Sequence, residues 1–185
     1  MITLIRHGKV QLDEQRRWRT IEVRDLVACY NRSPIKPPRQ KATEPRQGTV
    51  ILCSDLPRSQ ESATLLFGRF DRSDALFREG EMPDLPAFPF AFPASLILAT
   101  SRILWQLGRS NNCESFDDFR SRCEIAVDFL VDQHERTGAP VILVGHATLN
   151  HFLSKALRRR GWTGPRIPST RHYAASEFQA PSALH

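Results

Sequence analysis

The sequence lacks any apolar run long enough to cross a membrane, since no stretch approaches the roughly 18 consecutive apolar residues that a transmembrane helix needs. Cysteine is also scarce. The four cysteines show no CxxC spacing and are too few for a disulfide scaffold. Residues 1–5 have the pattern of a strand, which leaves no place for the charged and apolar regions of a signal peptide. We therefore expect a cytoplasmic protein with reduced thiols and no membrane partner.

No group of His, Cys, Asp and Glu has the spacing of metal ligands, so we expect neither a metal nor another cofactor. The chain also lacks internal repeats. Its net charge of +6 comes mostly from arginine, which suits bidentate contacts to an anionic partner such as phosphate. The arginines are spread along the chain, and the one tight run, 158–160, falls where a helix should end. Nucleic acid is therefore not the expected partner, and the oligomeric state stays open.

Short apolar runs alternate with segments of helical periodicity, a pattern typical of an α/β protein. Strands are expected at 2–5, 50–53, 75–77 and 141–144. Helices are expected to start near residues 23, 57, 96, 115 and 149, and the tail beyond Ser176 is expected to be frayed. A length of 185 residues predicts one domain over 1–185.

The segment after the third expected strand is rich in proline and phenylalanine. A proline at every third or fourth residue excludes a regular helix or a central strand. The interleaved aromatic rings must nevertheless pack, so we expect an ordered cap at about residues 80–113. The residues concerned are Pro83, Pro86, Phe88, Pro89, Phe90, Phe92 and Pro93.

Polar motifs follow three of the expected strands. Arg6-His7-Gly8 follows the first strand, Ser54 to Arg58 follows the second, and Gly145-His146 follows the last. In open parallel sheets, ligand sites form at the carboxyl ends of the strands. We therefore expect these motifs to meet in one site.

The order and residues of these motifs resemble the histidine phosphatase superfamily, which includes the cofactor-dependent phosphoglycerate mutases. The resemblance rests on residues 4–8, 54–63 and 144–146. It implies a three-layer α/β/α sandwich with a largely parallel sheet. It also implies a phosphatase that acts on a small phosphorylated substrate through a phosphohistidine on His7, with Arg6, Arg58 and His146 holding the phosphoryl group.

Such residues suit that chemistry. A neutral ring nitrogen of histidine can attack phosphorus, provided that the other ring nitrogen is held as a donor. Two arginine side chains and a second histidine can then stabilise the charge on the phosphoryl oxygens without a metal.

The leaving group also needs a proton, which in the superfamily comes from a carboxylic acid after the third strand. Glu79 fits this pattern best, Glu81 is the alternative, and an acid elsewhere, such as Asp13, stays open. Val10 and Asp13 stand where many members carry Thr and Asn, and the glycine-rich segment of the mutases is absent. The absence of that segment favours a phosphatase, while a phosphoglycerate-mutase-like phosphotransferase and a non-catalytic phospho-ligand-binding module remain the alternatives.

Four further histidines receive no functional assignment. We interpret His151 as a surface or packing residue. We assign no role to His134, His172 or His185.

Overall fold

The computed structural model describes residues 1–13, 15–40 and 42–181, and the chain groups into two compact units. The first comprises Met1–Lys9, Ile35–Glu79 and the described residues from Ser121 onward. The second comprises Val10–Pro34 and Gly80–Arg120. The sequence-based expectation of one domain with a cap at about 80–113 stays a prediction. Among the described residues, no helix is both long and apolar enough to cross a membrane.

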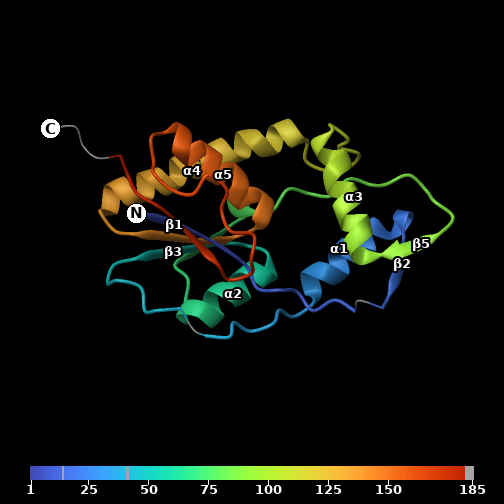
Figure 1. Ribbon diagram of the computed structural model, residues 1–185, viewed down its shortest axis with the longest axis horizontal. Coiled ribbons are helices and arrows are strands. Elements are labelled where there is room, and N and C mark those ends of the chain that lie inside the picture. The colour runs from blue at the N-terminus through green and yellow to red at the C-terminus, as the bar shows by residue number, and fades with distance from the viewer. Residues whose placement is uncertain (14, 41, 182–185) are drawn as a thin grey trace. The chain divides into compact units, whose positions relative to one another are not determined.

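A five-stranded sheet forms the centre of the first unit, in the order β4-β3-β6-β1-β7 (Figure 1). Its neighbouring strands pair in parallel except at one edge, where β7 runs antiparallel to β1. The sheet is therefore mostly parallel, as expected. Its strands are β1 (Ile2–Arg6), β3 (Val50–Ser54), β4 (Arg72–Asp74), β6 (Val141–Gly145) and β7 (Ala175–Phe178).

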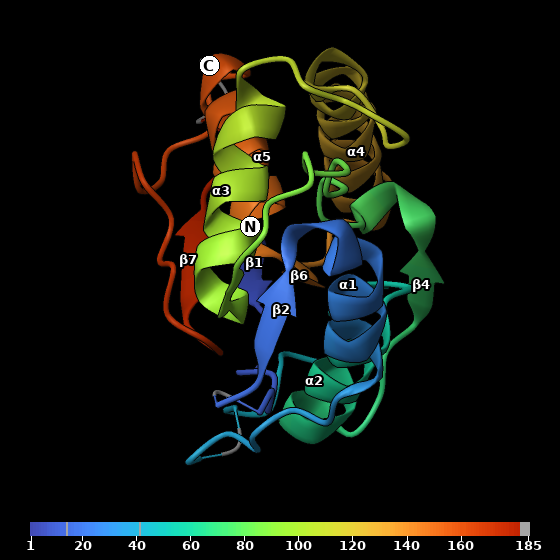
Figure 2. The same cartoon turned by 90° about the vertical axis from the view of Figure 1, so that its right-hand side faces the viewer.

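Helices cover both faces of this sheet, which confirms the mixed α/β architecture with a layer of helices on each side. Figures 1 and 2 show α2 (Pro57–Phe67) on one face, and α4 (Phe116–Thr137) and α5 (Ala147–Arg159) on the other. Side chains of a strand alternate between the two faces, so one set from β1, β3 and β6 packs against α2. That buried cluster consists of Ile5, Cys53, Ala63, Leu66, Ile142 and Val144.

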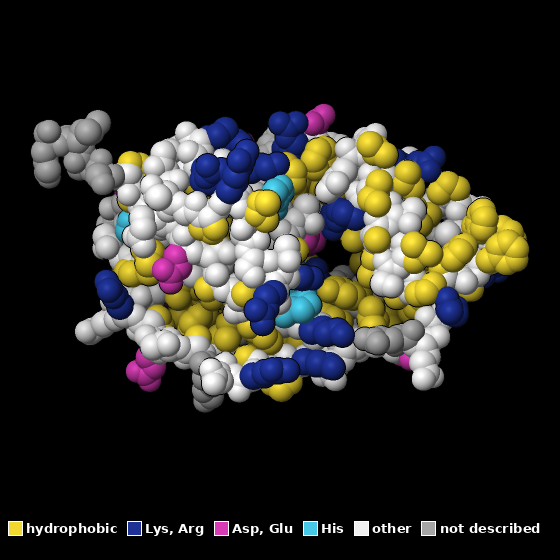
Figure 3. All heavy atoms as spheres, viewed as in Figure 1, with side chains coloured by type: hydrophobic (Ala, Val, Ile, Leu, Met, Phe, Trp, Pro, Cys, Tyr) yellow, Lys and Arg dark blue, Asp and Glu magenta, His cyan; other side chains and the backbone are white. Residues whose placement is uncertain are grey.

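The second unit has its own small core. Its two-stranded sheet pairs β2 (Arg17–Arg19) with β5 (Ala91–Pro93), and its helices are α1 (Val23–Arg32) and α3 (Ala94–Gln106), with the short η1 (Thr20–Glu22) before α1. Its buried cluster consists of Trp18, Val23, Leu26, Leu85 and Ile97. Hydrophobic side chains gather on the surface of this unit around α3 and β5 (Figure 3). Within the proline-rich segment, Phe92 pairs with Trp18, whereas Phe88 and Phe90 are exposed.

Two expectations about elements were wrong. Residues 75–77 form the short 3₁₀ helix η2, and the strand lies just before it, at β4. The Asp74 side chain accepts a hydrogen bond from the Leu76 backbone at 2.9 Å, and this cap favours a helical turn over a strand. Residues 177 and 178, which were expected to be frayed, belong to β7. This strand pairs with β1, and Phe178 is completely buried. His185 lies outside the described residues.

Candidate active site

The carboxyl ends of β1, β3 and β6 bring the three sequence motifs together within the first unit. β6 lies between the other two strands, with Gly145 opposite Arg6 of β1 and Val144 opposite Cys53 of β3. The backbone N–H of His7 donates to the Gly145 carbonyl at 3.0 Å. The residues that follow each strand, His7 and His146 among them, therefore lie side by side.

His7 is held in the tautomer that a nucleophile requires. Its Nδ1 lies 2.7 Å from the carbonyl oxygen of Gly8. Because a carbonyl can only accept, Nδ1 carries the hydrogen and donates, which leaves Nε2 with its lone pair. The side chain is only 4% exposed, and the ring of the fully buried His146 lies 5.0 Å away between centroids. His7 therefore presents one reactive nitrogen beside a second histidine ring.

The surroundings of His7 keep it neutral. Burial is the main cause, followed by the positive charge of Arg58; Arg6 and His172 act in the same direction, and together these effects lower the pKa of His7 from 6.5 to about 3. The bond to Gly8 opposes them, since it favours the protonated ring. The same arginine charges that disfavour a proton on His7 would attract a phosphoryl dianion. The site thus combines a neutral histidine ring with positive charges that suit an anion.

Hydrogen bonds from the first turn of α2 fix Arg58 beside His7. Pro57 occupies the first position of α2, where its missing N–H costs no hydrogen bond. The Ser59 hydroxyl donates to the Val144 carbonyl at 2.5 Å and so ties the start of α2 to β6. The Ser62 hydroxyl accepts from the Gly8 N–H at 2.8 Å and donates to the Arg58 carbonyl at 2.6 Å. Arg58, at 6% exposure, is therefore placed by bonds to both neighbouring motifs.

Residues 170–173 hold Arg6 and Gly8 from the other side. The Arg6 guanidinium donates to the Thr170 carbonyl, and the Tyr173 N–H donates to the Arg6 carbonyl at 2.8 Å. The Tyr173 hydroxyl in turn donates to the Lys36 carbonyl at 2.7 Å. A Cβ at Gly8 would lie 2.2 Å from that hydroxyl oxygen, so the ring needs a glycine there.

The two candidate acids lie in different units. Both carboxylate oxygens of Glu79 accept backbone N–H bonds at 3.0 Å, from Thr148 and Leu149 in the first turn of α5. Since His146 directly precedes α5, Glu79 lies at the same end of the sheet as His7. Glu81 belongs to the second unit, is exposed, and accepts from the Glu114 N–H at 2.8 Å.

Ion pairs and hydrogen bonds hold the chain just before Glu79. The Arg78 guanidinium forms two bonds to the Asp55 carboxylate, at 2.7 and 2.5 Å. Arg122 of α4 donates to the Leu76 and Arg78 carbonyls, each at 2.9 Å. Asp55, part of the second sequence motif, thus contributes to the placement of Glu79.

Asp13, the other carboxylate considered from the sequence, lies in the second unit. It is exposed and accepts a bond from the Gln15 N–H at 2.9 Å.

Sequence reasoning missed His172. Its Nδ1 lies 2.8 Å from the His7 carbonyl oxygen, and the two rings are 5.7 Å apart between centroids. No periodic pattern or motif surrounds His172 in the sequence, and its position follows from the antiparallel pairing of β7 with β1. The only local signal is a histidine just ahead of that edge strand.

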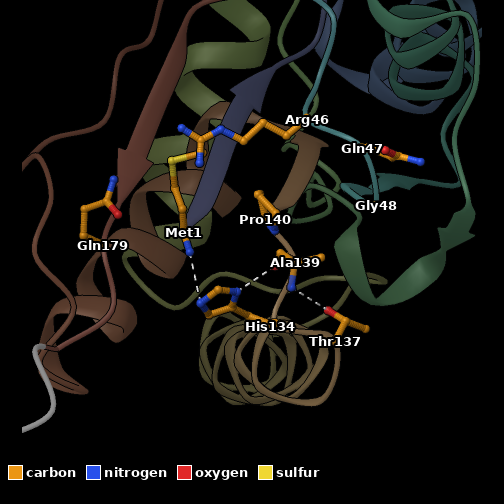
Figure 4. Close-up of a pocket in the computed structure, with 10 residues that line it drawn as sticks. Met1, Arg46, Gln47, Gly48, His134, Thr137, Ala139, Pro140 and Gln179 are labelled. Atoms are coloured by element: carbon orange, nitrogen blue, oxygen red, sulfur yellow. Dashed lines mark hydrogen bonds between the residues drawn. The ribbon is translucent and has the colours of Figure 1, made fainter.

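His134 and His151 lie away from these residues. His134 lines a cavity of about 650 Å³ at the opposite end of the sheet, where β1, β3 and β6 begin (Figure 4). Its Nδ1 donates to the Ala139 carbonyl at 2.7 Å, and its Nε2 accepts from the Met1 amine at 3.0 Å, which is a packing role. His151 contacts Phe152 on α5.

Arg6, His7, Arg58 and His146 thus gather at the carboxyl ends of parallel strands, where open α/β sheets bind their ligands. The sequence model of the histidine phosphatase superfamily (branch 1) matches residues 39–177. The chain therefore belongs to that superfamily. The match includes Arg58, Glu79 and His146, whereas Arg6-His7-Gly8 precedes it. No curated protein sequence matches the chain.

Solved structures show the same fold at low sequence identity. A mycobacterial glucosyl-3-phosphoglycerate phosphatase is 19% identical, with 98% of each chain covered and a TM-score of 0.51. Phosphoglycerate mutase from Bacillus anthracis str. Sterne is 14% identical, with 97% of this chain and 91% of that chain covered and a TM-score of 0.52. The fold is therefore that of phosphoglycerate-mutase-like proteins.

Proposed function

We propose that the chain is a metal-independent phosphatase that hydrolyses a phosphomonoester through a covalent phosphohistidine on His7. One observation carries the proposal: a neutral His7, with Nδ1–H bonded to the Gly8 carbonyl, lies among Arg58, Arg6 and His146. The superfamily membership and the phosphatase among the structural neighbours agree with it. The proposed substrate is a small phosphorylated molecule.

In the first step the lone pair of His7 Nε2 forms a bond to phosphorus, and the bond between phosphorus and the ester oxygen breaks. Glu79 gives its proton to that oxygen, so the alcohol leaves neutral. Arg6, Arg58 and His146 hold the phosphoryl oxygens, whose charge they stabilise during the transfer. The His7 ring keeps its proton on Nδ1, still hydrogen-bonded to the Gly8 carbonyl, and becomes a phosphoimidazolium.

In the second step water attacks phosphorus, Glu79 takes a proton from it, and the P–N bond breaks to release inorganic phosphate. The position of Glu79 supports its role as the acid and base, because N–H groups of α5 next to His146 hold its carboxyl group. A carboxyl oxygen that accepts one N–H bond still has a second lone pair, which can hold the transferred proton. His7 returns to its neutral form, and no co-reactant other than water is needed.

The test is the phosphoenzyme itself. With a generic aryl phosphate and a panel of phosphorylated metabolites, the wild-type protein should release one inorganic phosphate per alcohol formed. Rapid acid-free quenching of a labelled substrate should trap an acid-labile, base-stable phosphoprotein. His7→Ala should lose the label and nearly all turnover, because its Nε2 is the proposed attacking atom.

His151→Ala is the matched control, since it removes a half-buried histidine of α5 away from His7. It should keep both label and turnover, and both variants should retain the wild-type circular dichroism spectrum. A label that persists in His7→Ala would place the covalent intermediate elsewhere. Transfer of the phosphoryl group to an added alcohol, in place of phosphate release, would instead indicate a phosphotransferase.

A further inference from the structure

His172 lies against the nucleophile in an arrangement that is more than a surface contact. Its Nδ1 donates to the His7 carbonyl at 2.8 Å, so Nδ1 carries the hydrogen and Nε2 is the ring nitrogen that can gain a proton. Its ring is 5.7 Å from the His7 ring, compared with 5.0 Å for His146. The rings of His146 and His172 are therefore both close neighbours of the His7 ring.

The backbone around His172 is fixed by the same residues that form the phosphate site. Thr170 accepts from Arg6, and Tyr173 donates to the Arg6 carbonyl at 2.8 Å. Tyr173 has a φ of 62°, in the left-handed region that residues other than glycine rarely adopt. Such a conformation persists where surrounding contacts hold it, and here the bonds from Tyr173 to the Arg6 and Lys36 carbonyls do so.

The charges near His172 are positive, which suits a change of protonation when an anion arrives. Burial lowers the pKa of His172, and the positive charges of Arg6 and Lys9 lower it further, while the bond to the His7 carbonyl raises it. Arg6, Lys9 and His7 are the titratable or charged groups that act on it. A phosphoryl dianion would reverse the sign of the local potential and favour the imidazolium.

We propose that His172 is a further phosphate-binding residue, which takes up a proton when the dianion binds and donates Nε2–H to a phosphoryl oxygen. This inference rests on the proposed function only in that the phosphoryl group is taken to lie at His7. The two histidines reach the site differently. His146 is fully buried and directly precedes α5, whereas His172 comes from the segment before the edge strand β7.

Two variants separate the nitrogens of the ring. In His172→Asn the side-chain amide can replace Nδ1 as donor to the His7 carbonyl, but Nε2 and the charge are gone. In His172→Gln the amide can approach the position of Nε2, as a neutral donor. Sulfate is the probe, because it stays dianionic over the range of about pH 5 to 8 in which histidine titrates.

In the wild-type protein, sulfate should raise the pKa of His172, measured by NMR of ring-¹⁵N histidine. Sulfate binding, measured by the same titration, should strengthen as the pH falls through that pKa. At pH 6, His172→Asn should bind sulfate about tenfold or more weakly, the range of one charge-assisted hydrogen bond, and its binding should depend less on pH. His172→Gln should fall between the two and should also show a flattened pH profile.

Wild-type sulfate affinity and pH profile in His172→Asn would overturn the inference, as would an unshifted His172 in the NMR titration. A loss in His172→Gln with none in His172→Asn would mean that His172 only positions His7 and would overturn it too. These results are independent of turnover. A phosphoenzyme with no sulfate effect at His172 would leave the proposed function intact, whereas a sulfate effect without any phosphoenzyme would remove that function and support the binding role.

Discussion

Burial and the guanidinium groups of Arg58 and Arg6 all lower the pKa of His7. The His7 side chain is therefore neutral near pH 7. A nucleophilic nitrogen needs its lone pair, and the bond from Nδ1–H to the Gly8 carbonyl decides which nitrogen keeps it. Arg58 therefore has two effects, since its charge disfavours a proton on His7 and would attract the anion that we propose His7 attacks.

The neutral state of His7 has a consequence for stability. The unfolded chain binds a proton on this residue near pH 6.5, while the folded protein does so only near pH 3. Between these values the unfolded state binds more protons, so the stabilisation is complete above pH 6.5 and is lost as the pH falls toward 3. His7→Asn removes the titration. The difference in free energy of unfolding between wild type and His7→Asn should shrink by about 1–2 kcal/mol from pH 7 to pH 5.

Urea unfolding at several pH values, followed by circular dichroism, measures this difference. His151→Asn is a suitable comparison, because partial burial and the neighbouring Lys155 also lower the pKa of His151. A difference between wild type and His7→Asn that stays constant over this range would show that His7 titrates alike in the folded and unfolded states.

Most of the residues that come together around His7, but not His172, could be predicted from the sequence. Arg6, His7, Arg58 and His146 could be predicted because each ends or directly follows a strand, or lies in the first turn of a helix, and parallel strands end at one edge. His172 could not, because its position depends on tertiary bonds: the Arg6 guanidinium donates to the Thr170 carbonyl, and the Tyr173 N–H donates to the Arg6 carbonyl. No local pattern encodes such bonds.

Among the elements, the start of α5 explains how a carboxylate from a distant segment reaches His146. The first N–H groups of a helix have no partner within it, and no side chain at His146 caps them. Glu79 supplies one acceptor oxygen to each of two such groups, the N–H of Thr148 and the N–H of Leu149. The helix start thereby fixes Glu79 at the end of the strands.

Comparison of Glu79→Gln with Glu81→Gln tests the acid. An alkyl phosphate has a poor leaving group and needs the proton, so Glu79→Gln should lower its kcat by about 10²–10⁴-fold. An aryl phosphate with an acidic phenol hardly needs protonation and should lose much less. Glu81→Gln, whose carboxylate lies in the second unit, should behave like wild type on both substrates.

Steady-state kinetics with the two substrate types, together with thermal unfolding, would separate chemistry from stability. Loss of the α5 cap in Glu79→Gln should cost about 1 kcal/mol of stability, because a neutral amide still offers one acceptor. The opposite kinetic pattern would move the proton to Glu81. Small, equal losses in both variants would point to a third donor.

The contact between Gly8 and Tyr173 joins β1 to the segment before β7. In Gly8→Ala the new methyl group would meet the Tyr173 hydroxyl oxygen at 2.2 Å, and that hydroxyl is bonded to Lys36. We expect a loss of about 1–3 kcal/mol in unfolding free energy, as for other overpacked sites, and a lower kcat because His7 adjoins the displaced ring.

A double-mutant cycle identifies the cause. Tyr173→Gly removes the ring and also relieves the left-handed backbone at that position, so Gly8→Ala should cost far less in that background. Additive losses in the double variant would mean that the methyl group is harmful for a reason other than Tyr173.

The elements themselves were predicted well where a periodic pattern was long. Helix α4, with Phe119, Cys123 and Ala126 buried, and the apolar strand β6 were both evident. The error at residues 75–77 arose because three apolar residues fit a short strand and a single helical turn equally well. The hydrogen bond from Leu76 to the Asp74 side chain decided between them. β7 was missed because only Phe178 marks it as apolar and buried.

For the whole chain, the excess of arginine matters in two separate ways. Several arginines lie in ion pairs near the surface, such as Arg160 with Glu124 and Asp128. Such pairs contribute little each and are screened by salt. Arg58, in contrast, is almost fully buried beside His7, where its charge acts in surroundings of low dielectric constant. The net charge of +6 therefore says less about function than the burial of one guanidinium group.

This distribution of charge leads to a prediction about metals. Among residues 1–13, 15–40 and 42–181, no group of three or more His, Cys, Asp and Glu could hold a metal ion. The proposed stabilisation of the phosphoryl oxygens comes from Arg6, Arg58 and His146, with which a chelator does not compete. Prolonged dialysis against EDTA should therefore leave kcat and KM for an aryl phosphate unchanged, whereas Arg58→Lys should lower kcat/KM, because an ammonium group lacks the bidentate geometry of the guanidinium. EDTA saturated with calcium controls for effects of the chelator itself. If activity falls with free EDTA alone and returns with a divalent cation, the metal supplies a charge that we assign to the arginines, and the proposed mechanism is wrong.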